Sequence, residues 1–371
     1  MAKIVIDGRE LQGVMTGIGR FLHNFLKSLN NLDRETEYIL LLNRAANLEF
    51  AGGSIRYHVI PESSVTVWDQ VSLPGYLNTI GADLFFSPYY KLPVLAPCPA
   101  INTIHDVHFF TLPVYRRRNG FVLNAYYRLA GRLFCKKAKT VLTVSENTKK
   151  DILRVFHTPP EKIRVVYNGV DLNRFRTLPP LDVAARRKIL FPKIKGRFIL
   201  YVGNSKPHKN IPFLLNGYLS LPEEAKKNIQ LVLAGADEEQ LRCNGIVHND
   251  RIITLPNVPD EELPVLYNAA DVFVTPSLYE GFCLPVAEAM ACGTPVFASN
   301  GGAIPEVLGE AGCLFDPSRL NDFIDKIIRI IADDELRQSM SIKGLSRVRQ
   351  FSIELFAKRI ASVIDQSISK P

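Results

Sequence analysis

The sequence predicts an α/β protein of two domains, each built on a parallel sheet with helices on both faces. The chain has 371 residues, which suits two domains of ordinary size. Short apolar runs alternate with segments of helical spacing in the first half, and the alternation starts again in the second half. Continuous apolar strands between helices are typical of parallel sheets buried on both faces. Between the two series, residues 176–195 hold two adjacent prolines and a basic cluster, which predicts a linker.

The first series predicts a domain over residues 1–175. Apolar residues at helical spacing follow the first strand and predict a helix over Gly19–Leu29. A further helix is expected over Asn147–Phe156, with Ser145 as its N-cap. The strands expected in this domain are Lys3–Asp7, Tyr38–Leu42, Arg56–Ile60, Leu84–Ser87, Ala100–Ile104, Thr140–Val144 and Ile163–Val166.

The second series predicts a domain over residues 196–351. Ligands of open parallel sheets bind at the carboxyl ends of the strands, so two such domains in tandem predict a ligand in a cleft between them. An amphipathic helix follows over Ile353–Ile368, and residues 352–371 are expected to pack back on the first domain. The other elements expected are strands Phe198–Val202, Gln230–Ala234, Ile252–Thr254, Val272–Thr275 and Pro295–Ala298, and helices Ile211–Ser220, Glu261–Ala269, Leu284–Ala291 and Asp322–Ala332.

Composition and cysteine usage predict a cytoplasmic protein. Hydrophobic residues make up 47% and charged residues 22%, a balance typical of globular proteins. The first apolar run is too short for a signal peptide, and no run reaches the roughly 18 residues of a membrane helix. The six cysteines form no C-x-x-C pair, which argues against zinc-ribbon and thioredoxin-type sites. Isolated cysteines in apolar settings are typical of reduced thiols.

A basic segment concentrates the charge of the chain. The formal net charge is +8, and residues 116–154 alone hold eleven Lys and Arg against two acids. A helix expected over Asn119–Lys137 combines aromatic and basic residues. Residues 116–139 are therefore expected to contact the inner face of an anionic membrane. The alternative is an ordinary packed helix with a solvated basic face. No nucleic-acid-binding module accompanies the charge, so we expect no nucleic-acid partner.

The segment 276–288 predicts a ligand site. An expected strand ends at Thr275, a loop follows, and a helix is expected to begin near Leu284. A helix N-terminus offers backbone N–H groups to a phosphate. Glu280 lies in the loop and Glu288 about one turn inside the helix, where carboxylates suit sugar hydroxyls better than phosphate. Taken alone, two glutamates at this spacing are more often a surface acid and a dipole-compensating acid.

The surrounding residues overturn that simpler interpretation. Glu280-x7-Glu288, within P-S-x-x-E-G-F-x-L-P-x-x-E-A-M-A-x-G-x-P-V, resembles the signature of the group 1 (GT4-type) retaining glycosyltransferases. The resemblance implies the GT-B fold, in which two Rossmann-like domains face each other across a cleft. It spans nearly the whole chain, with further matching residues at Gly301-Gly302, Pro305-Glu306-Val307, Tyr201 to Asn210, Asn268 to Asp271, Thr16 to Arg20, His105-Asp106, Val144 to Glu146 and Asn168 to Asp171.

The resemblance assigns catalytic roles to His105, Lys209 and Glu280. It implies that Lys209 contacts the donor diphosphate, where a cation stabilises the charge that develops on the leaving group. It implies that His105 faces the donor sugar and Glu280 its hydroxyls. Taken singly, Lys209 is more often a solvated helix-start lysine and His105 a hydrogen-bonded core histidine.

The same resemblance implies a donor-binding set. Gly17 and Gly19 would let the backbone approach the diphosphate, although the pattern lacks the third glycine of a dinucleotide fingerprint. Asn204 stands where the family often has arginine, so Lys206 is expected to supply the missing charge or Asn204 to hydrogen-bond instead. The remaining members are Val258 near the base, Glu288 on the ribose, and Gly281, with backbone N–H groups of Phe282, Cys283 and Leu284 toward the sugar and diphosphate.

We therefore expect a retaining glycosyltransferase that uses a nucleotide-diphosphate sugar, without a metal or other cofactor. The chain lacks a D-x-D triplet, a P-loop and a G-x-S-x-G elbow. The variant at 203–210 resembles bacterial mannosyltransferases, so GDP-mannose is the expected donor, with a UDP-sugar as alternative, and a glycan or lipid-linked molecule the expected acceptor. The family is usually described by front-face substitution rather than by a Glu280 nucleophile. A nucleotide-sugar epimerase of the same fold and an inactive membrane-bound scaffold remain alternatives.

Overall fold

The structure, a computed structural model, describes residues 2–13, 15–29, 36–45, 55–62, 64–236 and 249–368. The side chains of Arg116, Arg118, Asn119 and Phe121 lie outside this description. The chain divides into an N-terminal unit, Met1–Gly169 with Phe351–Pro371, and a C-terminal unit, Val170–Gln350. Residues 170–175, expected in the first domain, therefore group with the second.

A parallel seven-stranded sheet forms the centre of the N-terminal unit among its described residues. Its order is β3-β2-β1-β4-β5-β6-β7, so the chain changes direction across the sheet between β1 and β4. The strands are β1 Lys3–Asp7, β2 Glu37–Leu42, β3 Ile55–Val59, β4 Leu84–Ser87, β5 Ala100–Ile104, β6 Thr140–Thr143 and β7 Ile163–Val165.

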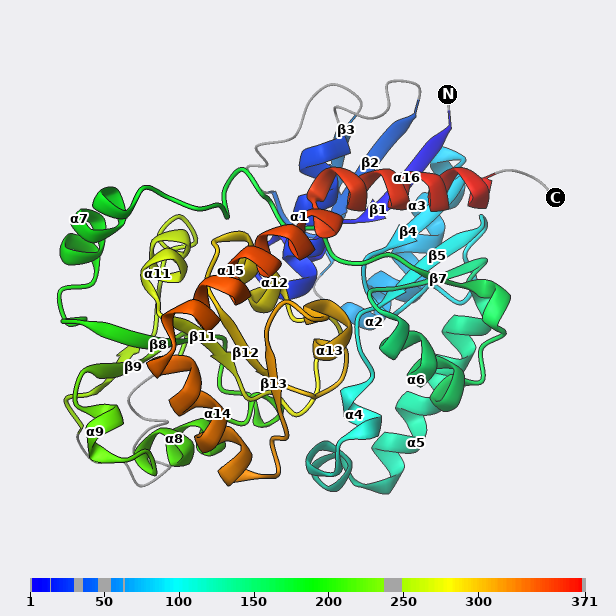
Figure 1. Cartoon of the computed structure of the whole chain (residues 1–371). Coiled ribbons are helices and arrows are strands. Elements are labelled where there is room, and N and C mark those ends of the chain that lie inside the picture. The colour runs from blue at the N-terminus through cyan, green and yellow to red at the C-terminus, as the bar shows by residue number, and fades with distance from the viewer. Residues whose placement is uncertain are drawn as a thin grey trace. The chain divides into compact units, whose positions relative to one another are not determined.

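Helices cover both faces of this sheet, as adjacent residues of β4 demonstrate. Phe86 packs edge-on against Phe25 of one helix layer, whereas Phe85 belongs to a buried cluster with Leu77 and Cys135 on the opposite face. In Figure 1 the last helix, α16, lies beside α1, and its Phe356 ring contacts Phe21. The helices are α1 Gly17–Leu29, α2 Val65–Val67, α3 Leu73–Ile80, α4 His108–Thr111, α5 Pro113–Lys137, α6 Glu146–Phe156 and α16 Ile353–Ile368.

The C-terminal unit repeats this architecture with a parallel six-stranded sheet among its described residues, in the order β10-β9-β8-β11-β12-β13. The strands are β8 Arg197–Val202, β9 Ile229–Ala234, β10 Ile252–Leu255, β11 Val272–Thr275, β12 Val296–Ser299 and β13 Cys313–Phe315. The helices are α7 Pro180–Leu190, α8 Ile211–Leu219, α9 Glu223–Lys226, α11 Leu263–Ala269, α12 Leu284–Ala291, α13 Ile304–Leu308, α14 Leu320–Ala332 and α15 Asp334–Val348.

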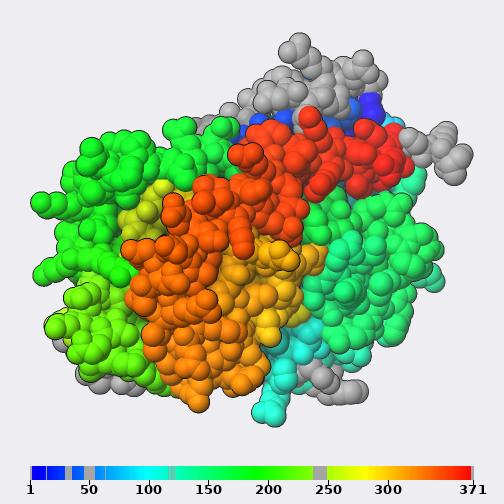
Figure 2. Space-filling model, in the orientation of Figure 1, coloured from blue at the N-terminus to red at the C-terminus, as the bar shows by residue number. Residues whose placement is uncertain are grey.

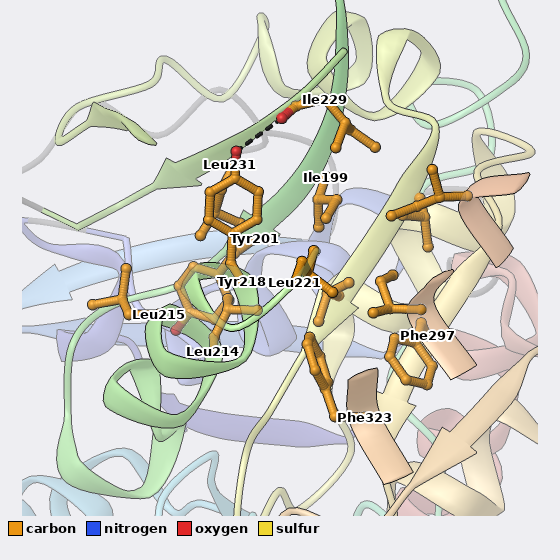
Figure 3. Packing of buried hydrophobic residues seen from close by; sticks show 14 of the residues in the cluster. Ile199, Tyr201, Leu214, Leu215, Tyr218, Leu221, Ile229, Leu231, Phe297 and Phe323 are labelled. Atoms are coloured by element: carbon orange, nitrogen blue, oxygen red, sulfur yellow. Dashed lines mark hydrogen bonds between the residues drawn. The ribbon is translucent and has the colours of Figure 1, made fainter. Parts of the chain in front are cut away.

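An aromatic and aliphatic cluster fills one layer of this unit (Figure 3). Phe323 of α14 packs on Phe297 of β12 with ring centroids 5.3 Å apart. Tyr218 of α8 is buried, and its hydroxyl donates to the carbonyl of Ile229 over 2.8 Å. This hydrogen bond satisfies the polar group of the tyrosine side chain, which would otherwise be buried without a partner. Figure 2 shows α14 and α15 forming a continuous outer surface over this unit.

The predicted α/β class with two parallel sheets is confirmed, and Ser145 caps α6 by accepting from Thr148 N–H over 3.0 Å. Several elements were not predicted from the sequence, and β13, α15 and α7 are the most informative of them. The strand β13 has only three residues, α15 has little apolar periodicity, and the expected linker 176–195 contains the helix α7. The helix α7 packs against α11 and buries Val183, so the paired prolines begin a helix here.

Among the described residues, no helix is both long enough and apolar enough to cross a bilayer.

Gly131 tests the packing of α5 on α6. A Cβ at Gly131 would lie 2.3 Å from the ring of Phe156, whereas a Cβ at Gly75 in α3 would meet no atom within 4 Å. We expect Gly131→Ala to lower the free energy of unfolding by about 1–3 kcal/mol through overpacking. Gly75→Ala should leave it unchanged or slightly higher, since alanine favours a helix.

The single tryptophan, Trp68, is buried in the N-terminal unit, so its fluorescence in urea reports the unfolding of that unit. Equal midpoints for the two alanine variants would contradict the close α5–α6 contact.

Candidate functional site

Loops at the carboxyl ends of β8 and β11 form the centre of the candidate site in the C-terminal unit. These strands are neighbours in the sheet, with β9 and β10 on one side and β12 and β13 on the other. The loops that follow β8 and β11 therefore lead to opposite sides of the sheet, and open parallel sheets bind ligands at such a point. The two loops meet directly, because the N–H of Leu278 donates to the carbonyl of His208 over 2.7 Å.

An ion pair joins these loops. Lys209, at the end of a short 3₁₀ turn over Pro207–Lys209, donates from Nζ to Oε1 of Glu280 over 2.7 Å. The side chains are only 15% and 11% exposed, so the attraction is stronger than in a surface pair, while both ions lose hydration. The fold thus brings together two of the three predicted catalytic residues, 71 positions apart in the chain.

Ser277 is a third member of this cluster, and the sequence analysis did not single it out. The Oγ of Ser277 donates to the same Oε1 of Glu280 over 2.6 Å. The hydroxyl oxygen of Thr275 lies 3.1 Å from the Oγ of Ser277. Both residues are buried. The sequence did mark this residue, because Ser277 is the serine of the P-S-x-x-E run. Only the fold shows that its hydroxyl holds the Glu280 carboxylate.

The loop after β12 supports Glu280 from behind. Gly302 has φ +58°, and a Cβ there would lie 2.4 Å from the carbonyl oxygen of Glu280. A Cβ at Gly301 would lie 2.4 Å from the carbonyl oxygen of Ser277. The N–H of Ala303 donates to the Glu280 carbonyl over 2.9 Å. The glycine pair therefore allows two backbones to come into contact, which fixes the loop that carries Glu280.

Backbone geometry at Cys283 directs the chain into α12. Cys283 occupies the left-handed region with φ 76° immediately before Leu284, and Pro285 lies in the first turn. The first N–H groups of such a helix have no partner within the helix and can serve an anion. Burial, with the nearby Glu280 charge, raises the pKa of the Cys283 thiol. Cys283 therefore stays a neutral thiol at neutral pH and is not a nucleophile. Gly281 and Phe282, which precede it, are buried.

Glu288 lies deeper than Glu280. Its residue is 4% exposed, and its Oε2 accepts from the hydroxyl of Tyr267 in α11 over 2.9 Å. A buried carboxylate needs such a donor. The Tyr267 contact was not foreseen, because α11 and α12 are separate in sequence and come into contact only in the folded chain.

Asn204 and Lys206 share the loop that carries Lys209. The Asn204 Oδ1 accepts from the backbone N–H of Lys206 over 3.2 Å, and both residues are exposed. The hydroxyl of Tyr201 donates to the Asn204 carbonyl over 2.8 Å. Asn204 therefore shapes this loop locally, and the Lys206 side chain extends toward solvent. Val258 is half-buried in the loop after β10, the strand at the edge of the sheet.

In the N-terminal unit, Gly17 and Gly19 begin α1. The N–H of Gly19 donates to the hydroxyl of Thr16 over 3.1 Å, which satisfies an N-terminal amide of the helix. A Cβ at Gly19 would lie 2.6 Å from the Glu10 carbonyl oxygen, so internal packing requires glycine there. A Cβ at Gly17 would meet no atom within 4 Å. Only Gly17 therefore presents an open backbone to a ligand.

His105 follows β5 and is held on two sides. Its Nε2 lies 2.9 Å from the Pro88 carbonyl oxygen, and its ring meets Phe21 edge-on with centroids 4.9 Å apart. Burial lowers the pKa of His105, so the imidazole is neutral at pH 7. A carbonyl can only accept, so Nε2 carries the proton and Nδ1 remains an acceptor.

Asp106 contacts the ring of His108 through Oδ1 and Nδ1. Burial raises the pKa of this carboxyl, but the hydrogen bond and charge of His108 outweigh burial and lower the pKa. Asp106 therefore stays ionised beside His105, whose ring it can influence electrostatically.

A second charged cluster lies after β1. Arg9 bridges Asp7 and Asp69 with two 2.6 Å contacts, and its guanidinium lies 4.8 Å from the Trp68 ring centroid. Burial raises the pKa of Asp69, although Arg9 opposes the shift. No local pattern in the sequence marks this cluster, because Asp69 comes from a segment of the chain far from Asp7 and Arg9.

These features suit a ligand that carries both phosphate and hydroxyl groups. Lys209 supplies a positive charge, the start of α12 supplies backbone donors, and Glu280 supplies a carboxylate acceptor. Lys209 and Glu280 neutralise each other in this ion pair. A phosphate can replace Glu280 on Lys209, and hydroxyl groups can replace Lys209 on Glu280.

Two family models match most of the chain. Residues 182–347 match the family described as "Glycosyl transferases group 1", and residues 15–174 match "Glycosyltransferase Family 4".

Two curated relatives share about a third of the aligned residues. O-antigen chain mannosyltransferase B of Escherichia coli is 34% identical over 73% of this chain and 71% of its own length. The MMP alpha-(1->4)-mannosyltransferase of Mycolicibacterium hassiacum is 32% identical over 70% of this chain. The alignment spans only 60% of that second protein.

Solved structures match the fold across both units. Sucrose-phosphate synthase of Thermosynechococcus elongatus has a TM-score of 0.81 at 21% identity, covering 99% of each chain. HepE of Anabaena, solved in complex with UDP-glucose, has a TM-score of 0.77 at 19% identity and covers 99% of this chain and 100% of its own.

A double-mutant cycle tests the Ser277 contact. We expect Ser277→Ala to lower the stability of the C-terminal unit by about 1.5–3 kcal/mol, because a hydrogen bond to an ionised carboxylate is lost. In a Glu280→Gln background the loss should be smaller, since the acceptor is then uncharged. Hydrogen exchange of backbone amides in β11 and α12 measures both values. Additive effects, within about 0.5 kcal/mol, would show that Ser277 does not act through Glu280.

Proposed function

Because the chain belongs to the group 1 (GT4) family of retaining glycosyltransferases, we propose that it transfers mannose from GDP-mannose to a glycan or lipid-linked acceptor without a metal. The carrying observation is the Lys209–Glu280 pair at the β8/β11 strand ends, with the start of α12 beside it. The choice of mannose is supported by relatives named as mannosyltransferases, at 34% and 32% identity. A UDP-sugar is the alternative donor. A cytoplasmic location remains part of the proposal.

Donor binding replaces the ion pair with two better-matched contacts. The diphosphate binds the Nζ of Lys209, and hydroxyl groups of the sugar donate to the Glu280 carboxylate. Ser277 keeps that carboxylate in position. The exchange keeps every charge partnered in a site where little water remains to solvate it. A ligand that lacks either the diphosphate or the sugar would leave one partner unmatched.

The reaction proceeds on one face of the sugar. An acceptor hydroxyl oxygen forms a bond to the anomeric carbon as the bond from that carbon to the diphosphate oxygen breaks. The hydroxyl proton passes to a phosphate oxygen of the departing nucleoside diphosphate. Lys209 and the N–H groups at Phe282, Cys283 and Leu284 stabilise the charge that accumulates on the leaving group. Glu280 orients the sugar through its hydroxyls and forms no covalent bond.

The other predicted residues complete the donor site in this proposal. The open backbone at Gly17 approaches the diphosphate, Gly19 allows the close contact with Glu10 that shapes this loop, and neutral His105 faces the donor sugar. The Glu288 carboxylate already accepts a hydrogen bond from the Tyr267 hydroxyl, and in this proposal it also accepts one from a ribose hydroxyl. Two oxygens with about four lone-pair positions allow a carboxylate to serve both.

Three further residues lie at the margin of the donor site. Val258 would contact the base. Lys206, which is exposed, adds charge near the phosphates, and Asn204 shapes its loop.

A thermal-shift screen against GDP, UDP, ADP and their sugar conjugates tests the donor. We expect a selective rise in Tm with GDP and GDP-mannose that EDTA does not change. A selective response to UDP-glucose would reassign the donor, and loss of the shift in EDTA would overturn the metal-independent site. Consumption of the donor without acceptor, giving an isomeric nucleotide sugar, would instead support an epimerase.

Substitutions at the ion pair test the two roles. Glu280→Ala should abolish transfer while GDP still raises Tm, because the carboxylate contacts the sugar and not the nucleotide. Lys209→Ala should lower kcat/KM by about 100-fold or more, since it removes a charge aimed at the leaving group. Lys326→Ala is the matched control, because Lys326 pairs with Asp322 within α14. Wild-type kinetics for Lys209→Ala would remove Lys209 from the mechanism.

A further inference from the structure

The helix α5 exposes an apolar stripe on one side. Val122, Tyr126, Leu129 and Leu133 are 80%, 63%, 69% and 39% exposed. Their spacing of four, three and four residues places them along a single face of a helix. The opposite side of the helix is packed, with Cys135 buried in the core. The helix therefore has a satisfied inner face and an outer face that turns large apolar side chains to solvent.

This stripe differs from scattered surface apolar residues, which are ordinary in proteins. Its members line one face of a single helix, and they include Tyr126, an aromatic residue with a polar tip. Tyrosine of this kind is typical of the boundary between apolar and aqueous phases. The backbone of Gly120 is not helical, with φ 67°, so α5 is kinked there and residues 121–137 form its second part.

Cations border the stripe. Arg128, Arg132, Lys136 and Lys137 are exposed on the same helix, and residues 121–137 contain no acid. The segment 116–154 holds eleven basic residues against two acidic ones, in a chain whose net charge is +8. An apolar stripe among long basic side chains is complementary to a surface with apolar chains beneath anionic headgroups. A protein partner would more often meet a charge-depleted apolar centre.

We propose that the outer face of α5, from Val122 to Lys137, docks on an anionic lipid bilayer. Val122, Tyr126, Leu129 and Leu133 enter the headgroup boundary, and Arg132, Lys136 and Lys137 contact the phosphates. Docking is peripheral and reversible, because one short stripe buries limited apolar area. The surface belongs to the N-terminal unit, and none of these residues takes part in the proposed donor site.

Co-sedimentation with vesicles tests the docking surface. The full chain is mixed with vesicles of equal parts phosphatidylcholine and phosphatidylglycerol, or of phosphatidylcholine alone. We expect binding to the anionic vesicles that weakens as salt rises, and weak binding to the neutral ones. A triple variant, Arg132→Gln with Lys136→Gln and Lys137→Gln, should bind about 100-fold more weakly, at roughly fivefold for each cation. The matched control replaces Lys188, Lys193 and Lys343, three exposed lysines of the C-terminal unit, with glutamine.

The apolar contribution is tested separately. Tyr126→Ser with Leu129→Ser should weaken binding to anionic vesicles by about 100-fold, because the free energy gained by burying two large apolar side chains in the bilayer is lost. The control is Leu181→Ser with Ile342→Ser, two C-terminal positions that are 85% and 62% exposed. The nucleotide-induced rise in Tm should be unchanged in every variant, which separates this proposal from the donor site.

Three results would overturn the docking surface. Wild-type vesicle binding in both α5 variants would place any membrane contact elsewhere. Conversion of a dimer to a monomer by Tyr126→Ser with Leu129→Ser, with vesicle binding unaffected, would assign the stripe to a second copy of the chain. Salt-sensitive binding of RNA that the triple variant abolishes, without vesicle binding, would assign the cations to nucleic acid.

Discussion

The candidate site depends on one contact, the ion pair between Lys209 and Glu280. A cation and a carboxylate that are each mostly shielded from water lose hydration, and their mutual attraction offsets that loss only when the geometry is good. Here the fold supplies the geometry. Adjacent parallel strands, β8 and β11, end at the same edge of the sheet, so the loops that follow them must meet.

The surroundings of Glu280 restrict its motion. Ser277 donates to its carboxylate from within the same loop, and the loop after β12 contacts its backbone through Gly302 and Ala303. Loops from three strand ends therefore converge on Glu280, two of them on its carboxylate and one on its backbone. A side chain fixed in this way is ready to meet sugar hydroxyls without reorganising, which is the condition for effective electrostatic stabilisation. Lys209 has a longer, flexible stem, so it is the partner better suited to move when a diphosphate arrives.

The N-terminal unit arranges its polar groups by the same rule. His105 follows β5, and Arg9 follows β1, so both side chains lie at carboxyl ends of strands. The contacts of His105 with Pro88 and Phe21 fix its ring and leave Nδ1 as an acceptor. Burial keeps this ring uncharged, which suits a role near a sugar better than a role as a phosphate-binding cation.

The sequence by itself determined the class of the fold and which segment carries the two candidate glutamates. Apolar runs such as Val272–Thr275 are buried on both faces, and burial of that kind leaves a readable signal in local sequence. Glu280 and Glu288 could be placed in a loop and the following helix for the same reason. Short or weakly periodic elements, such as β13 and α15, left no comparable signal.

Only the tertiary structure decided which groups touch. Lys209 and Glu280 are 71 residues apart, and Tyr267 reaches Glu288 from another helix. These contacts follow from the order of strands in the sheet, which local propensity does not encode. The same holds for α5, whose composition suggested a basic helix but not which side was packed. Burial of one side and exposure of the other depend on the helices and strands that α5 meets, and those come from distant parts of the chain.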